Sequence, residues 1–223
     1  MLKNLFVLIS IFMVSNLGLS HFAEVEGASQ ISKKEWVSLC KKAKGETERT
    51  CKMIRMHLKV YPSLYSGKWG KVYDKLKNKK LLFLHGLEIS DISPLAGFTK
   101  LESLSITQSH IVDLSPLLSL INLRDLDLSY NNITDISLVS KIENLEKLVM
   151  IGNGISDLSP LRELTNLKNL DLGYNRIVDV SPLADLKGLR ELYLDGNYIF
   201  DLFPLLNLHL SQVSLLRLTA QAN

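Results

Sequence analysis

The hydrophobic residues between positions 79 and 210 follow a pattern that is neither helical nor simply alternating. Counted from Leu123 as offset 1, apolar side chains stand at offsets 1, 4, 6, 11, 14, 17 and 20, and Asn131 stands at offset 9. The pattern recurs without a break in six copies of 22 residues, which begin at Lys79, Leu101, Leu123, Leu145, Leu167 and Leu189. A fixed period of this length predicts a solenoid, in which stacked copies bury one continuous core that no copy could bury alone.

Each copy is predicted to begin with a short strand, because offsets 4 and 6 alternate and would point the same way. The asparagine at offset 9 follows that strand, and its amide is expected to bond backbone groups of the turn and to repeat this from copy to copy. The last four copies carry it, as Asn131, Asn153, Asn175 and Asn197. Leu87 and Ser109 replace it in the first two copies, so the ladder is expected to begin at the third.

Offset 13 is an aspartate in every copy: Asp91, Asp113, Asp135, Asp157, Asp179 and Asp201. The Ser-Pro-Leu that usually follows predicts a short helical turn, with the serine as its cap and the proline at its first position. A row of aspartates could also be read as a metal ladder. An aspartate present in every copy is better interpreted as a scaffold residue that caps the turn backbone.

The motif L-x-x-L-x-L-x-x-N-x-I-x-D-[ILV]-S-P-L-x-x-L, over residues 79–210, resembles the 22-residue leucine-rich repeats of bacterial internalins. It also resembles the related intracellular phosphatase-regulatory repeat proteins. The resemblance implies an α/β solenoid with a concave parallel β-sheet, short 3-10 or helical turns on the convex side and a helical cap before the repeats. It further implies a non-catalytic protein that binds another protein.

We expect four segments: a signal peptide over 1–28, a helical cap over 29–78, six repeats over 79–210, and a partial repeat or C-terminal cap over 211–223. In the first segment an apolar run from Leu5 to Val14 follows Lys3. The run is shorter than the roughly 20 residues of a membrane span and fits a secretory signal, although an uncleaved anchor is the alternative. Cleavage after Ser20 and cleavage after Gly27 both remain open. Export is therefore predicted, to a secreted, periplasmic or cell-surface location.

The cap is expected to hold two helices that meet near Gly45. Ser32 and Glu35 have the spacing of a capping box at the start of the first helix. Cys40 and Cys51 are the only cysteines, and in an exported chain they favour a disulfide between the two helices, stabilising by about 2–3 kcal/mol. Four aromatic residues spaced four apart are expected to dock on the first repeat: Tyr61, Tyr65, Trp69 and Tyr73.

Charge divides the chain into two parts. Residues 29–80 hold 15 Lys and Arg against 4 Asp and Glu, whereas residues 81–223 hold 10 against 17. The basic cap is most simply a solvated helix face, and the alternative is a cell-envelope component held to an anionic surface such as lipid headgroups or polyanionic glycans. An exported chain without a recognition motif does not indicate nucleic-acid binding.

Candidate binding residues lie at offsets 3, 5, 7 and 8, where the strands face outward. There an apolar centre is surrounded by carboxylates and tyrosines, the composition of a binding hot spot. The predicted partner-binding residues are Asp125, Asp127, Tyr130, Lys147, Val149, Ile151, Asp171, Tyr174, Glu191, Tyr193 and Asp195. We expect a protein partner with a basic or mixed surface, and a monomeric chain that self-associates weakly through its C-terminal edge.

Catalysis is not predicted. Asp125 and Asp127 would lie about 6.6 Å apart along one strand, a spacing near that of glycosidase carboxylates. An open sheet, however, offers little burial to raise the pKa of one of them. The sequence shows no Ser-His-Asp or Cys-His arrangement, no glycine-rich phosphate loop and no metal-spaced cluster, so no cofactor and no metal are expected.

Overall fold

The structure is a computed structural model, and it describes residues 32–57 and 69–214. The predicted signal peptide, Tyr61, Tyr65 and the last nine residues of the chain, 215–223, lie outside the described residues.

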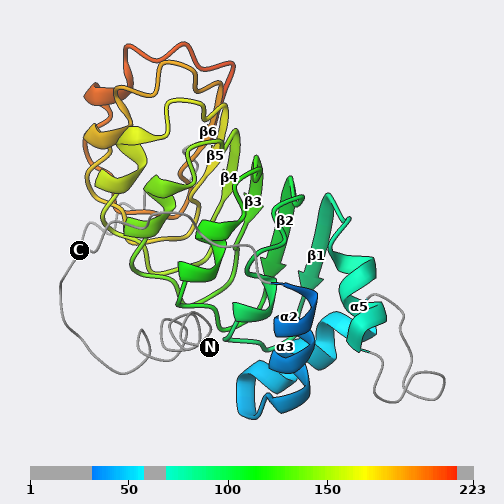
Figure 1. Ribbon diagram of the computed structural model, residues 1–223. Helices are drawn as coiled ribbons and strands as arrows, with labels where there is room; N and C mark the ends of the chain where they lie inside the picture. The colour runs from blue at the N-terminus through cyan, green and yellow to red at the C-terminus, as the bar shows by residue number, and fades with distance from the viewer. Residues whose placement is uncertain (1–31, 58–68, 215–223) are drawn as a thin grey trace, which may run out of the picture.

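Seven strands form one sheet, and all neighbouring strands are parallel and follow chain order. They are β1 (Leu81–His85), β2 (Ser103–Thr107), β3 (Asp125–Asp127), β4 (Lys147–Val149), β5 (Asn169–Asp171), β6 (Glu191–Tyr193) and β7 (Gln212–Ser214). Figure 1 shows the strands side by side along one face of an open sheet that does not close on itself. The outward side of this sheet is called the concave face below.

Short 3-10 helices occupy the opposite side of the solenoid, one in each copy (Figure 1). They are η1 (Ser93–Leu95), η2 (Ser115–Ser119), η3 (Ser137–Lys141), η4 (Ser159–Glu163), η5 (Ser181–Leu183) and η6 (Phe203–Leu205). The predicted α/β solenoid of leucine-rich repeats, with its parallel sheet and helical turns, is confirmed.

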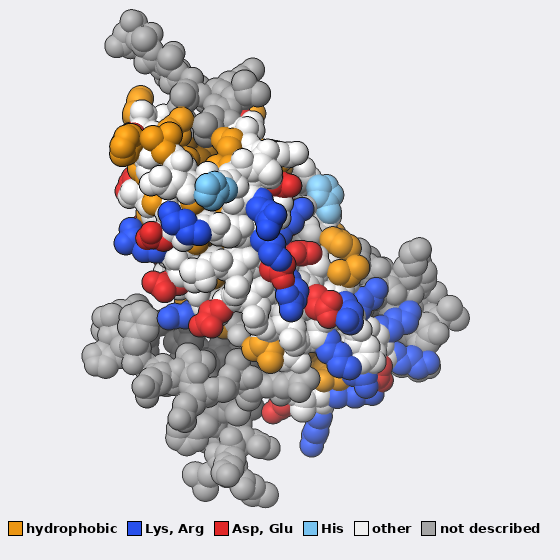
Figure 2. All heavy atoms as spheres, turned by 90° about the horizontal axis from the view of Figure 1, so that it is seen from above, with side chains coloured by type: hydrophobic (Ala, Val, Ile, Leu, Met, Phe, Trp, Pro, Cys, Tyr) orange, Lys and Arg blue, Asp and Glu red, His pale blue; other side chains and the backbone are white. Residues whose placement is uncertain are grey.

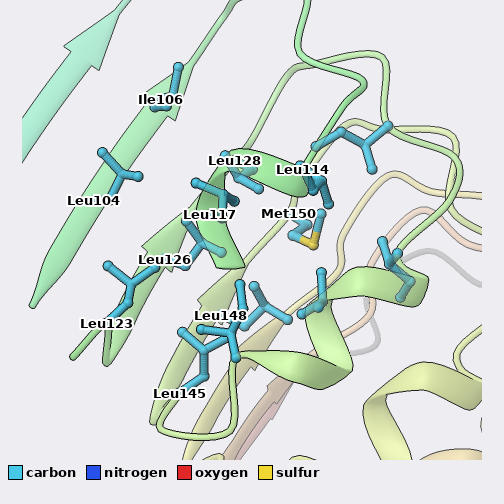
Figure 3. Close-up of a cluster of buried hydrophobic side chains, with 14 of the residues drawn as sticks. Leu104, Ile106, Leu114, Leu117, Leu123, Leu126, Leu128, Leu145, Leu148 and Met150 are labelled. Carbon is cyan, nitrogen blue, oxygen red and sulfur yellow. The ribbon is translucent and has the colours of Figure 1, made fainter. Parts of the chain in front are cut away.

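The core runs the length of the solenoid between the sheet and the turns. Figure 3 shows how the inward pairs of successive strands stack, from Leu104 and Ile106 through Leu126 and Leu128 to Leu148 and Met150. Each of these side chains is at most 1% exposed. Because every copy supplies its apolar residues at the same offsets, the side chains form continuous rows, which confirms the inward prediction for offsets 4 and 6.

The register changes at the last strand. From β1 to β6 each paired residue lies 22 positions beyond its partner, but Gln212 pairs with Glu191 only 21 positions earlier. On β7, Val213 takes the inward position opposite Leu192 yet remains 47% exposed, because no described strand lies beyond it.

Three helices cap the β1 end of the sheet: α2 (Lys33–Lys42), α3 (Gly45–His57) and α5 (Trp69–Leu76). The capping box at the start of α2 is present, since the Glu35 backbone N–H donates to Ser32 Oγ and the Ser32 backbone N–H donates to Glu35 Oε2. Gly45 begins α3 with φ at +61°, a conformation that glycine adopts without steric cost. None of the helices in the described ranges is long and apolar enough to cross a membrane.

The cap docks on the first repeat through a buried aromatic cluster around Trp36. The Trp36 ring lies 6.2 Å from Trp69, 5.8 Å from Tyr73 and 5.9 Å from Phe98 of the first repeat, measured between ring centroids. Its indole N–H donates to the carbonyl oxygen of Pro94 over 2.6 Å. The docking prediction is thus confirmed for Tyr73, whose ring centroid lies 5.5 Å from that of Phe98, whereas Trp69 packs on Trp36 within the cap.

The predicted disulfide joins Cys40 of α2 to Cys51 of α3, and the Cα atoms lie 5.7 Å apart. Both cysteines are buried beside the aromatic cluster. The bond therefore closes the Gly45 turn and holds the two helices in the arrangement that docks on the first repeat.

Candidate functional site

An asparagine ladder fixes the ends of the strands from β3 to β6 and so positions most residues of the concave face. Asn175 accepts from the Ile155 backbone N–H over 3.0 Å, and its amide N–H groups donate to the carbonyl oxygens of Met150, Leu172 and Gly173. Asn131, Asn153 and Asn197 repeat this arrangement one copy apart. The predicted ladder, including its start at the third copy, is confirmed.

The aspartates at offset 13 hold the turns on the convex side. In every copy the carboxylate accepts from the backbone N–H two residues later over 2.8 Å, as Asp157 does from Ser159. The scaffold interpretation of this row is thus confirmed. The prediction that serine caps the turn is wrong, because each serine is the first residue of its 3-10 helix and the preceding aspartate supplies the capping oxygen. Proline accordingly stands one position later than predicted.

The concave face contains every predicted binding residue of offsets 3 and 5 in an exposed or half-buried state. The strand pairing aligns them in two rows. The first row contains Asp125, Lys147, Asn169 and Glu191, and the second contains Asp127, Val149, Asp171 and Tyr193. The scaffold therefore brings these side chains onto one continuous surface.

The residues of offset 7 are less accessible than the strand pattern predicted. Thr107, Ser129 and Gly173 are buried, whereas Ile151 and Asp195 are half-buried. The hydroxyl and the backbone N–H of Ser129 both donate to Asp127 Oδ1, over 2.7 and 3.0 Å. At this offset Ile151 and Asp195 therefore supply the accessible side chains of the C-terminal repeats.

Three carboxylates lie on the concave face between β3 and the end of β6: Asp127, Asp171 and Asp195. They are called the acidic trio below. Burial raises the pKa of Asp171, and the negative charges of Asp195 and Asp127 raise it further, against a hydrogen bond from the Gly173 backbone N–H that lowers it. The Asp195 carboxylate accepts from the Ser214 hydroxyl over 2.8 Å. This surface is thus a region of concentrated negative charge in which a cation would be stabilised.

An apolar centre lies among these carboxylates. Val149 is aligned between Asp127 and Asp171 in adjacent strands, and Ile151 follows it two residues later. The Cγ2 atom of Ile151 comes within 4.0 Å of the Cβ position above Gly173. Partly exposed aliphatic groups beside charged ones offer a partner both apolar contact and charge pairing.

Tyr130 and Tyr174 stand at the edge of the concave face, where the chain leaves β3 and β5. Both side chains are more than half exposed, at 51% and 57%. Tyr193 differs, because it lies within β6 and its hydroxyl donates to Gln212 of β7 over 2.7 Å. The two edge tyrosines are therefore the most accessible aromatic groups among the predicted binding residues.

Two exposed apolar residues on β1 were not among the predicted binding residues. Leu81 and Phe83 stand at the outward positions of this strand, at 53% and 52% exposure. Their offsets, 3 and 5, are those used to choose the other candidates, so the repeat pattern itself could have indicated them. They extend the concave face toward the helical cap.

An alternating charge ladder runs along the margin where the strands begin. Lys80 pairs with Glu102 over 2.7 Å, and Glu146 pairs with both Arg124 and Lys168. Hydrogen bonds from Lys168 and Arg124 lower the pKa of Glu146. These pairs link neighbouring copies, so this margin is better explained as part of the scaffold.

In the part of the chain that the structure describes, no group of three or more His, Cys, Asp or Glu residues is arranged to hold a metal ion.

Figure 2 shows Lys and Arg side chains dense over the helical end and hydrophobic side chains gathered at the opposite, C-terminal end.

The repeat, its asparagine ladder and the parallel sheet together define a leucine-rich repeat protein. A family described as "Leucine Rich repeats (2 copies)" matches residues 121–163 and 165–212. Comparison with curated protein sequences gives no significant match.

Comparison with solved structures shows which leucine-rich repeat proteins the chain is similar to. Internalin C2 from Listeria monocytogenes is 40% identical, with a TM-score of 0.54, over 57% of this chain and 59% of that one. Internalin F from the same organism is 36% identical, with a TM-score of 0.56, over 57% of this chain and 38% of that one. A leucine-rich repeat protein from Leptospira interrogans is 28% identical, with a TM-score of 0.53, over 58% of this chain and 34% of that one. The chain is therefore an internalin-like leucine-rich repeat protein, and it spans 59% or less of the length of these structures.

Proposed function

We propose that the protein is an exported, non-catalytic recognition module that binds a protein partner on the concave face. Leucine-rich repeat solenoids present extended concave surfaces, and binding is what such surfaces are used for. One observation carries the proposal: Val149 and Ile151 are partly exposed within the acidic trio, on strands whose positions the asparagine ladder fixes.

The partner expected at this surface has a basic or mixed surface with an apolar contact at its centre. A Lys or Arg of the partner would relieve the mutual repulsion of the acidic trio, and an apolar group would cover Val149 and Ile151. The disulfide in the cap supports export, because such bonds form and persist in oxidising compartments.

The test compares what the mature chain, residues 29–223, captures from cell-envelope and host-cell extracts with what two triple variants capture. The concave variant is Asp125→Lys, Val149→Asp and Tyr193→Ala. The matched convex variant, Glu163→Lys, Val178→Asp and Tyr198→Ala, makes the same kinds of change at exposed positions away from the sheet. Captured proteins are identified by mass spectrometry after circular dichroism has shown that all three chains are folded.

The proposal predicts a protein that the wild-type chain and the convex variant retain and that the concave variant loses. Equal capture by all three chains would move the binding site away from the concave face and overturn the proposal.

A second candidate function is attachment to an anionic surface through the helical cap. Lys34 and Lys41 lie two turns apart on one face of α2, and with Val37, Ser38 and Gly70 they line a shallow hollow between α2 and α5. Binding to vesicles that contain anionic lipid, released by high salt and reduced by Lys34→Glu with Lys41→Glu, would support this function. Absence of vesicle binding at low salt would exclude the lipid form of it.

A further inference from the structure

At one position in each repeat the backbone adopts a left-handed conformation, with a positive φ. At offset 8 the chain turns from the strand into the loop that brings the asparagine inward, and φ lies between +51° and +67° in all six copies. The residues there are Gly86, Gln108, Tyr130, Gly152, Tyr174 and Gly196. Glycine takes this conformation without steric cost, whereas a bulky side chain is a genuine outlier there. The two tyrosines therefore occupy positions that glycine fills in three other copies.

The residue at offset 8 of the copy after each tyrosine is a glycine, and the tyrosine ring occupies the space where a side chain would lie. A Cβ atom added to Gly152 would lie 2.6 Å from Cδ1 of Tyr130, and one added to Gly196 would lie 2.7 Å from Cδ1 of Tyr174. Each tyrosine ring is thus laid over the glycine of the next copy, and more than half of its side chain still faces solvent. Backbone strain that presents an exposed aromatic ring is typical of a functional position rather than of a packing one.

The spacing of the two rings points to a class of ligand. Tyr130 and Tyr174 are two copies apart, which corresponds to about 9.5 Å from the spacing of parallel strands. A polyproline II helix rises about 3.1 Å per residue with three residues per turn, so prolines one turn apart are separated by about 9.3 Å. Aromatic-lined surfaces bind such helices because their conformation is preformed and little entropy is lost.

The charge beside the rings distinguishes a peptide from the other common stacking ligand, a neutral glycan. Asp195 accepts the Tyr174 backbone N–H through its own carbonyl, and the acidic trio lies alongside on the concave face. A basic residue next to the prolines would use this negative charge, which a neutral sugar does not.

We infer that Tyr130 and Tyr174 form a two-ring platform for a proline-rich segment of the partner, held in the polyproline II conformation, with an adjacent Arg or Lys paired to the acidic trio. The inference rests on the proposed function and names the chemistry of the partner at that surface. The platform residues touch the ligand and set its specificity.

The first test uses the wild-type chain alone and depends on no substitution. Calorimetric titration compares a peptide of six prolines followed by two arginines with one of three prolines followed by two arginines. The two-ring platform predicts that the longer peptide binds about ten-fold more tightly, because only it spans both rings. A peptide in which Gly and Ser replace the six prolines is expected not to bind. Equal affinities for the three peptides, or no binding by any of them, would overturn the inference.

The second test changes the rings. Tyr130→Gly with Tyr174→Gly is expected to lower the affinity for the six-proline peptide about ten-fold or more without lowering the unfolding midpoint, because glycine relieves the backbone strain. Tyr130→Phe with Tyr174→Phe retains both rings and is expected to bind as the wild type does. Tyr198→Gly, at an exposed tyrosine outside the platform, is the matched control. Undiminished binding by the glycine variant, or loss of binding by the phenylalanine variant, would contradict the platform.

A third titration uses cellohexaose, a neutral β-linked oligosaccharide. Binding of this sugar that depends on both tyrosines, without peptide binding, would replace the peptide by a glycan and overturn the inference. Failure of the inference is distinguishable from failure of the proposed function, because protein capture that is lost in the concave variant would stand even if no proline-rich peptide binds.

Discussion

At the scale of single residues, the asparagine at offset 9 of the last four repeats is expected to contribute more to stability than any ion pair of the surface. The Asn175 amide joins backbone groups of two neighbouring copies and supplies the acceptor for the buried Ile155 N–H. Surface ion pairs such as Lys80 with Glu102 are exposed and contribute at most about 1 kcal/mol.

Asn175→Ala is therefore expected to lower the free energy of unfolding by about 1–3 kcal/mol, because it leaves the buried Ile155 N–H without its acceptor. Asn132→Ala is the matched control, since Asn132 is exposed and its side chain forms a long hydrogen bond with the His110 ring. Urea unfolding followed by circular dichroism measures both. Similar losses in the two variants would show that the ladder does not have the role assigned to it.

The raised pKa of Asp171 makes the stability of the folded chain depend on pH. Its pKa is raised above the ordinary value of 3.8, so the folded chain holds a proton that the unfolded chain has already released. Stability from this group is therefore lost as the pH rises above 3.8 through the raised pKa. Asp171→Asn, which keeps the acceptor for the Gly173 N–H, is expected to raise the unfolding midpoint at neutral pH and to leave it unchanged below pH 3.8.

Titration of the Asp171 carboxyl carbon by NMR measures the shift directly. A pKa at or below 3.8 would contradict the account of the acidic trio.

At the scale of elements, the repeat period was enough to predict the strands, the turns and the asparagine ladder. It predicted these features because the same offsets are buried in every copy, as Leu126 and Leu148 are. It failed for the cap of the convex turn, because Asp and Ser are both good capping residues and stand two positions apart. Only the backbone geometry shows that the aspartate accepts the N–H of the serine.

The hydrophobic pattern of the repeats also did not predict how many residues each strand contains. β1 and β2 contain five residues each, whereas β3 and β5 end at Asp127 and Asp171. The strands β4 and β6, which end at Val149 and Tyr193, are equally short. Offset 7 is buried both within the longer β2, at Thr107, and beyond the shorter β3 and β5, so its exposure does not follow strand length.

The helical cap is an element whose stability can be followed separately, because the only two tryptophans of the chain, Trp36 and Trp69, both lie in it. Cys40→Ser with Cys51→Ser is expected to destabilise the cap by about 2–3 kcal/mol. The transition followed by tryptophan fluorescence should therefore move to lower temperature more than the transition of the whole chain followed by circular dichroism. Reduction of the wild-type chain should reproduce the effect, and equal shifts of both signals would contradict it.

At the scale of the whole molecule, the two ends of the solenoid differ in how far their apolar residues are covered. The first repeat is covered by the aromatic cluster of the cap, while the C-terminal end exposes Phe200, Phe203 and Leu206 at 86%, 76% and 71% (Figure 2). Exposed apolar groups gathered in this way favour association between molecules.

We therefore predict weak self-association through the C-terminal end, seen by light scattering as a rise in mean mass at high concentration. Phe200→Ser with Phe203→Ser should abolish the rise at little cost in stability, because both side chains are exposed and other repeats carry serine at these offsets. Val112→Ser, at an exposed residue far from this end, is the control. A constant monomeric mass for the wild-type chain at all concentrations would remove the prediction.

The central claim, that the concave face binds a protein, is tested most directly by site-specific photo-crosslinking. A photo-reactive amino acid is placed at Val149, on the concave face, and separately at Val178, on an exposed loop of the convex side, and each chain is irradiated in the extract from which a partner was captured. The account predicts one covalent adduct of defined mass from position 149 and none from position 178. The same adduct from position 178, with none from position 149, would place the partner on the other side of the solenoid and contradict the claim.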